Sequence, residues 1–236
     1  MPIWFIWTNT TTHPRGLLRV RITKPMADRI IIAELAALQH LLVVKQVIGN
    51  NIAGNKHIHL IVSAGAILNL QRMQSDKKHL APYANFLATR FAGCRISMDK
   101  DSKWIESFRP DSVDELLVNE PQREMVKVPG IGDVAVTQHV LEQFTHRFLT
   151  ETKPDKLVQV AWKKLTETAA DMSVREVSKH RLCPRVLREN SGKIEGRYFL
   201  NAKRNLIFVV TDNPLEGKRL VTTYPANRTF HDMKAA

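Results

Sequence analysis

The spacing of apolar side chains changes about halfway along the chain. In the first half, short runs with the period of a strand alternate with longer runs of helical spacing. The pattern predicts strands at 3–7, 17–22, 57–62 and 94–98, and helices at 30–42, 66–73 and 80–91. Strands that alternate with helices are typical of an α/β domain.

In the second half, helical periods come first and strand periods follow. The pattern predicts a helix from Thr137, its expected N-cap, to Phe148, and a second helix over 156–168. Residues 172–177 are expected to form a short helix or turn. Strands at 196–200, 206–210 and 218–225 complete an α+β arrangement of helices followed by an antiparallel sheet.

A segment rich in proline and glycine separates the two patterns. Residues 119–134 contain Pro121, Pro129, Gly130 and Gly132, which favour turns over regular structure. We therefore expect domains at 1–118 and 135–236, with 119–134 as a linker.

One carboxylate interrupts the apolar helix at 30–42. Glu34 is either partly exposed in a first helical turn, where the helix dipole favours negative charge, or buried with a partner. The surrounding Ala33–Leu38, an Ala-Glu-Leu-x-Ala-Leu motif, resembles the ribonuclease H-like family. The resemblance implies a mixed sheet with helices, and four carboxylates that clamp two catalytic metal ions.

Two of the acid positions implied by the resemblance are not acidic here. Asn9 matches the first, and Ser63, or Ala64, matches the second. Asp114, on an expected late helix at 112–117, would be the fourth carboxylate beside Glu34. We therefore expect a degenerate domain that binds no metal and needs no cofactor, with Asn9, Glu34, Ser63 and Asp114 as the remnant of the site.

The second half resembles the small metal-independent ribonuclease toxins of the RelE, barnase and colicin-like group. The resemblance lies in a helix with His139, His146 and Arg147 and in a final strand over 221–225 that reads Val-Thr-Thr-Tyr-Pro. Cleavage without metal needs a base, a cation for the charged phosphorane and an acid. The expected catalytic residues are His139, His146, Arg147, Arg197, Tyr198, Thr222 and Tyr224. Arg197 and Tyr198 are neighbours on a strand, so only one of them can face a given cleft.

Composition adds a strong preference for anionic partners. The formal charge is +12, and half of this excess lies between Val174 and Arg204. Such a surplus attracts nucleic acid by steering and by counterion release. The expected phosphate contacts are Arg175, Lys179, Arg181, Arg185, Arg188, Lys193, Lys203 and Arg204. The alternative is that this basic segment is a solvated loop without a role in binding.

Other classes of protein fit less well. Two cysteines far apart do not suggest a disulfide framework or a zinc site. No apolar run is long enough to span a membrane, and no signal peptide is expected, so the sequence favours a cytoplasmic protein.

The leading hypothesis is an RNA-binding protein with metal-independent endoribonuclease activity in its second half, with RNA and an inhibitor protein as candidate partners. The rivals are a non-catalytic nucleic-acid-binding or regulatory protein and a metal-dependent ribonuclease H-like nuclease.

Overall fold

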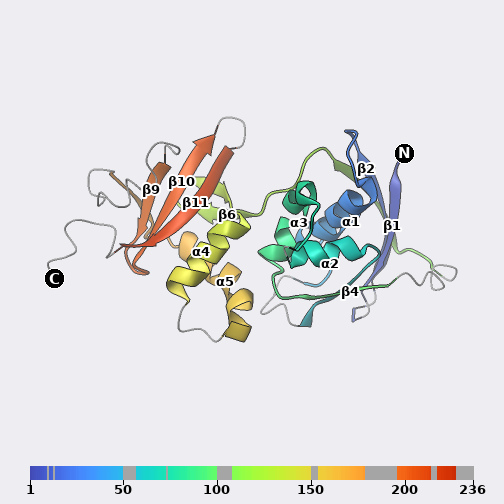
Figure 1. Ribbon diagram of the computed structural model, residues 1–236, viewed down its shortest axis with the longest axis horizontal. Helices are drawn as coiled ribbons and strands as arrows, with labels where there is room; N and C mark the ends of the chain where they lie inside the picture. The colour runs from blue at the N-terminus through green and yellow to red at the C-terminus, as the bar shows by residue number, and fades with distance from the viewer. Residues whose placement is uncertain are drawn as a thin grey trace. The chain divides into compact units, whose positions relative to one another are not determined.

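A computed structural model describes most of the chain and defines two compact units, Met1–Gln122 and Arg123–Ala236 (Figure 1). The described residues are 1–9, 11–12, 14–49, 57–72, 74–99, 108–149, 154–178, 196–213 and 217–226, with the backbone alone described for 154–159 and 213. Each unit has its own hydrophobic core, and the fold is of mixed α/β class.

The first unit packs helices against small mixed sheets. Its strands are β1 (Ile3–Thr8), β2 (Arg15–Ile22), β3 (His59–Val62), β4 (Arg95–Met98) and β5 (Ser112–Val118). Its helices are α1 (Arg29–Gln39), which continues as a π-helical turn (His40–Val44), α2 (Gly65–Gln71), a 3-10 turn (Lys78–Leu80) and α3 (Ala81–Ala88). The sheet β1–β2–β5 joins an antiparallel pair to a parallel one, and β3 pairs with β4 in parallel.

Alternation along β2 sets the two faces of the first sheet. Leu18, Val20 and Ile22 are buried against α1 in the core, whereas Arg19 and Arg21 point to the other face. At Gly16 the core face has no room for a side chain, because a Cβ there would lie 2.6 Å from Nε1 of Trp7. This close approach of an indole to the backbone of β2 requires glycine.

The segment 112–117 is a strand and not the predicted helix. Leu116 and Val118 are buried, while Val113 and Leu117 are 64% and 57% exposed. This period of two suits a strand that covers one side of a core. The six residues pair in parallel with β2, from Gly16↔Ser112 onward, so a partner almost a hundred positions away decides the conformation.

The second unit places helices α4 (Gln138–Phe148) and α5 (Pro154–Ala169) on one face of a six-stranded sheet (Figure 1). The strand order is β6-β7-β11-β10-β9-β8. The strands are β6 (Met125–Val128), β7 (Gly132–Ala135), β8 (Arg175–Val177), β9 (Gly196–Asn201), β10 (Leu206–Asn213) and β11 (Gly217–Pro225). A smaller apolar cluster, which includes Tyr198, Val209 and Tyr224, lies apart from the main core.

Two segments of this unit differ from the prediction. The segment 119–134, predicted as a linker, contains β6 and most of β7, which form a hairpin around Gly130 and Gly132 at positive φ. Residues 172–177 were predicted as a short helix or turn; 172–173 form a turn, but Arg175–Val177 form strand β8, which pairs with β9. Thr137 is the N-cap residue of α4, but its side chain makes no capping hydrogen bond.

Candidate functional site

A cluster of polar side chains joins the last turn of α4 to the end of β11. One terminal nitrogen of the half-buried Arg147 guanidinium donates a hydrogen bond of 3.2 Å to Oγ1 of Thr222 and another to the backbone carbonyl of Thr223. The guanidinium carbon lies 4.5 Å from the centroid of the Tyr224 ring. Three of the seven predicted catalytic residues therefore meet in one place.

The pairing of β11 explains why Arg147 can reach this place. Along the described part of the chain, β11 pairs with β10 over its whole length but with β7 only at Arg219↔Ala135. The outer edge of β11 near Thr223 therefore meets a side chain from α4 instead of another strand. Thr222 and Tyr224 are two residues apart and share one face of β11, and Arg147 contacts these two side chains together with the backbone carbonyl of Thr223 between them.

Tyr198 lies close to this cluster on the same face of the sheet. Register places Tyr198 opposite Val209, which in turn faces Thr222 on β11. Burial, with a smaller contribution from Tyr224, raises the pKa of the Tyr198 phenol above its ordinary value of 10.0. The phenol therefore stays protonated near neutral pH, so it can donate a proton or a hydrogen bond but cannot act as a base.

The two predicted histidines lie outside the cluster. His139 and His146 are both exposed on α4. Thr222 and Tyr224 are buried, in contrast to these two imidazoles. A substrate would have to bridge an imidazole and the cluster for the two to work together.

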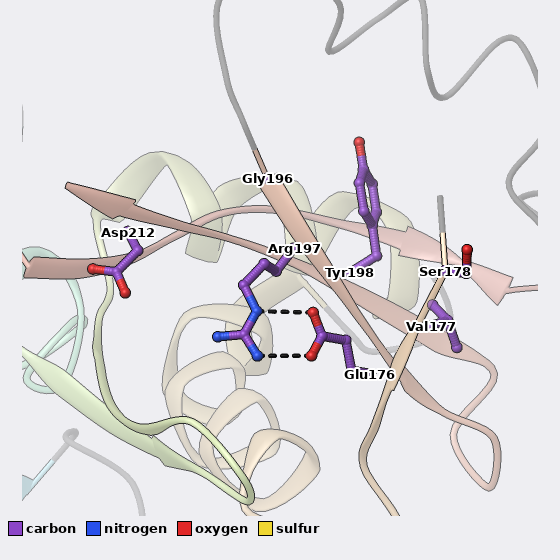
Figure 2. Close-up of a pocket in the computed structure, with 7 residues that line it drawn as sticks. All are labelled: Glu176, Val177, Ser178, Gly196, Arg197, Tyr198 and Asp212. Carbon is purple, nitrogen blue, oxygen red and sulfur yellow. Dashed lines mark hydrogen bonds and ion pairs between the residues drawn. The ribbon is translucent and has the colours of Figure 1, made fainter. Parts of the chain in front are cut away.

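Arg197 lies on the opposite face of β9 from Tyr198, as the alternation of the strand requires (Figure 2). Its guanidinium binds both carboxylate oxygens of Glu176, at 2.8 and 2.7 Å, and lies over the Phe199 ring at 5.2 Å. The hydrogen bonds from Arg197 hold the pKa of Glu176 below its ordinary value and raise the pKa of Arg197 itself. The predicted set of seven is therefore divided between two faces.

The Glu176–Arg197 pair lines an open pocket of about 390 Å³ at the end of β8 and β9. Asp212 on β10 lies across from Arg197, and Ser178 and Tyr198 also border the pocket, with the Tyr198 ring directed away from Arg197 (Figure 2). Sequence reasoning treated Glu176 only as one charge in a basic stretch and did not single out Asp212. The signal that could have revealed Glu176 was the alternation in Arg175-Glu176-Val177, which is too short to be recognised without its partner strand.

Glu34 is buried and partnered, which settles the choice left open by its sequence. It is 6% exposed, and its two carboxylate oxygens accept hydrogen bonds from the backbone N–H of Ser63 (2.6 Å) and the hydroxyl of Ser63 (2.7 Å). Ser63 follows β3 directly, so the pair ties α1 to the turn before α2.

The other two residues of the predicted remnant have different partners. The side-chain amide of Asn9 donates to the carbonyl of Val47 (2.7 Å), and Asp114 on β5 forms an ion pair with Lys45 (2.8 Å). Among the described residues, no group of three or more His, Cys, Asp or Glu side chains lies in a metal-binding arrangement.

Three of the eight predicted phosphate-binding cations lie within the described residues. Arg175 is exposed on β8, and Lys203 and Arg204 are exposed in the turn between β9 and β10. The pKa of Asp171 is below its ordinary value, mainly because of hydrogen bonds from Ser173. The nearby charges of Lys203 and Arg204 lower it further. Five of the predicted contacts lie outside the described residues: Lys179, Arg181, Arg185, Arg188 and Lys193.

Comparisons with protein-family models, curated proteins and solved structures found no match to this chain. The described helices include none that is both long enough and apolar enough to cross a membrane.

Proposed function

We propose that the chain is an RNA-binding protein whose second unit holds the phosphate backbone. The observation that carries the proposal is charge. Residues 123–236 contain 20 Lys and Arg against 13 Asp and Glu, and residues 1–122 contain 15 against 10. Both units are therefore cationic, and counterion release gives such surfaces affinity for polyanions.

The exposed cations Arg175, Lys203 and Arg204 are the described part of the proposed surface. Register puts Arg175 opposite Leu200, immediately before the turn that carries Lys203 and Arg204. The five cations at 179–193 lie outside the described residues and add to the positive charge of the same unit. Contacts of this kind set affinity and orientation but do not read sequence.

Salt dependence of RNA binding tests this proposal. The triple variant Arg175→Gln/Lys203→Gln/Arg204→Gln should weaken binding of every RNA sequence alike. Each lost contact should shallow the log–log salt slope by about 0.7 for single strands. The control is Lys127→Gln/Lys163→Gln/Lys164→Gln, which removes the same charge from other exposed positions. Equal slopes in the two triple variants would place the surface elsewhere, and absence of binding by the parent chain would contradict the proposal.

The contact of Arg147 with Thr222 and Tyr224 favours a second candidate function, metal-independent RNA cleavage. A guanidinium has five N–H donors, so Arg147 keeps donors for a phosphate beyond those used by Thr222 and Thr223. In this proposal Arg147 stabilises the charged phosphorane, Tyr224 is the acid, and His139 or His146 takes the proton from the 2′-hydroxyl.

Product analysis tests the catalytic proposal. Cleavage should persist in EDTA and leave a 2′,3′-cyclic phosphate. Loss of an acid or base typically costs about 10²–10⁴-fold in rate, which we expect for Tyr224→Phe and for one of His139→Ala and His146→Ala. Arg147→Lys, which keeps the charge, should be less impaired than Arg147→Ala. If all these variants cleave at the parent rate, the cluster does not carry the cleavage and the catalytic proposal fails. If RNA stays intact at high protein concentration, the chain does not cleave RNA, and the binding proposal alone stands.

The proposed ribonuclease H-like ancestry of the first unit is supported by the partnered Glu34 at the expected place on α1. A metal-dependent nuclease receives less support as a function. Both oxygens of Glu34 are engaged by Ser63, and Asp114 is engaged by Lys45.

A further inference from the structure

The face of the β1–β2–β5 sheet that points away from α1, here called the outer sheet face, combines aromatic, apolar and cationic side chains. Strand register arranges them in rows across the three strands. The rows are Ile6–Leu17–Val113, Trp4–Arg19–Glu115 and Arg21–Leu117, with Thr8–Arg15 at the end of the face. This face belongs to the first unit and has no part in the site proposed above.

On the outer sheet face, a tryptophan of the edge strand β1 packs against an arginine of the middle strand β2. Trp4 is 49% exposed, and the guanidinium carbon of Arg19 lies 5.6 Å from the centroid of its ring. An indole held in this way offers a flat apolar surface beside a cation. Aromatic side chains beside cations are the elements with which sheets bind unpaired bases.

Three arginines follow the middle strand of the same face. Arg15, Arg19 and Arg21 lie on β2, and Arg19 and Arg21 are two residues and therefore about 6.6 Å apart. Their partners in the structure are a carboxylate on β5 and one immediately before that strand. Glu115 binds Arg19 and Arg21 (2.7 Å to Arg21), and Asp111 lies 3.6 Å from Arg15.

These ion pairs are weak enough to be exchanged. All five side chains are between 30% and 59% exposed, and exposed pairs contribute little to stability. A phosphate can therefore replace a carboxylate at little cost. The row of arginines beside an exposed indole is complementary to a strand that carries one anion per base.

We propose that the outer sheet face binds single-stranded RNA, with a base stacked on Trp4 and phosphates bound by Arg19 and Arg21. The inference rests on the proposed RNA-binding function and adds to it a second, sequence-tolerant contact surface on the first unit. Duplex RNA buries its bases in the stack, so we expect this face to prefer unpaired strands.

The first experiment measures the tryptophan fluorescence of the full chain during titration with an unlabelled uridine oligonucleotide. The affinity is measured with a labelled form of the same oligonucleotide. Stacking should quench part of the fluorescence of the chain, which has four tryptophans. Trp4→Phe should lose this quenching and keep most of the affinity. Trp4→Ala should bind about five- to a hundredfold more weakly. Because Trp4 is half exposed, circular dichroism should show both variants folded.

The second experiment separates local contacts from overall charge. Arg19→Gln/Arg21→Gln should shallow the salt slope by about 1.4, because two phosphate contacts with a single strand are lost. The control Arg72→Gln/Arg95→Gln should change the slope less. Glu115→Gln, which frees both arginines, should tighten binding up to about fivefold. Glu167→Gln on α5 makes the same charge change elsewhere and should have a smaller effect.

The results separate failure of this inference from failure of the proposed function. If the parent binds RNA but Trp4→Ala, Arg19→Gln/Arg21→Gln and Glu115→Gln behave as their controls do, the outer sheet face is not a binding site and the function stands. If the parent does not bind RNA, both fail. A parent dimer that Trp4→Ala converts to a monomer at unchanged RNA affinity would assign the face to a second copy of the chain, and would overturn the inference.

Discussion

At the scale of single residues, the best-defined interaction is the buried carboxylate of Glu34. A buried charge is costly unless hydrogen bonds replace water, and Ser63 supplies two of them. Ser63→Ala removes the hydroxyl and keeps the backbone donor. Since hydrogen bonds to charged groups contribute about 1.5–3 kcal/mol, this variant should lose about that much unfolding free energy in a denaturant titration.

The matched control for this prediction is Ser97→Ala. The Ser97 hydroxyl also contacts a side chain, Nε2 of the exposed His59, at 2.7 Å. Surface substitutions of this kind usually change stability by no more than about 0.5 kcal/mol. Equal losses in the two variants would mean that the Glu34–Ser63 pair does not carry the stability assigned to it.

Cys94 gives a second prediction at this scale. Burial raises the pKa of its thiol to about 11, against smaller opposing effects that include a hydrogen bond from Gln71. With this pKa, about one thiol in a thousand is ionised at pH 8. The thiolate is the reactive form, so the native thiol should react slowly. In a Cys183→Ser variant, which leaves Cys94 as the one thiol, Ellman's reagent should react slowly with the native chain and at once in guanidinium. Immediate reaction of the native chain would contradict this assignment.

At the scale of elements, the pair Glu176–Arg197 ties the short strand β8 to β9. The folded-state pKa of Glu176 lies below its ordinary value, so the contribution to stability is complete above that ordinary value and is lost as pH falls through the folded-state pKa. Both side chains are about half exposed, which limits the contribution to about 1 kcal/mol.

Unfolding of the parent and of Glu176→Gln should therefore differ most at neutral pH and converge in acid below the ordinary carboxyl range. Glu167→Gln is the control, since Glu167 makes one exposed contact of 3.8 Å with Lys163. Its effect should be smaller at every neutral pH. A difference for Glu176→Gln that persists unchanged into acid would show that lost packing, and not the ion pair, is being measured.

Elements with a strong local pattern could be predicted from the sequence, and elements defined by a distant partner could not. The apolar spacing of α4 and the alternation of β9, β10 and β11 are visible in the chain itself. β5 was predicted as a helix because six residues of mixed character fit either period, and only its pairing with β2 decides. β6 and β7 were hidden by the prolines and glycines of the turns around them.

The candidate site follows the same division. Alternation predicted that Arg197 and Tyr198 separate, and the structure places them on opposite faces of β9. The contact of Arg147 with Thr222 and Tyr224 depends on how α4 packs against the edge of β11, which no local pattern encodes. For the same reason, residue type alone grouped the exposed His139 and His146 with the buried Thr222 and Tyr224.

At the scale of the whole molecule, the division at Gln122 and Arg123 predicts which fragments fold. A fragment 123–236 keeps β6 and β7, whereas 136–236 loses the buried Val126, Val128 and Val134. Burial of such side chains contributes about 1.5–3 kcal/mol each, so their sum approaches the whole stability of a domain.

We therefore expect 123–236 to unfold cooperatively on heating and 136–236 to show no such transition. Circular dichroism at 222 nm and hydrogen exchange provide the measurements, with 1–122 as a second fragment that should fold. A cooperative transition in 136–236 would favour a domain that begins near residue 135, as the sequence predicted.

Two units that each bind RNA, as proposed, would make the affinity of the chain depend on the length of the RNA. Once one unit has bound a strand, the other unit meets the rest of that strand at a high effective concentration. The overall affinity is therefore higher than the affinity of either unit alone. Oligonucleotides that fill one unit should bind weakly, and affinity should rise in a step at the length that engages both. The chain would then discriminate by contour length, a property that neither unit has alone.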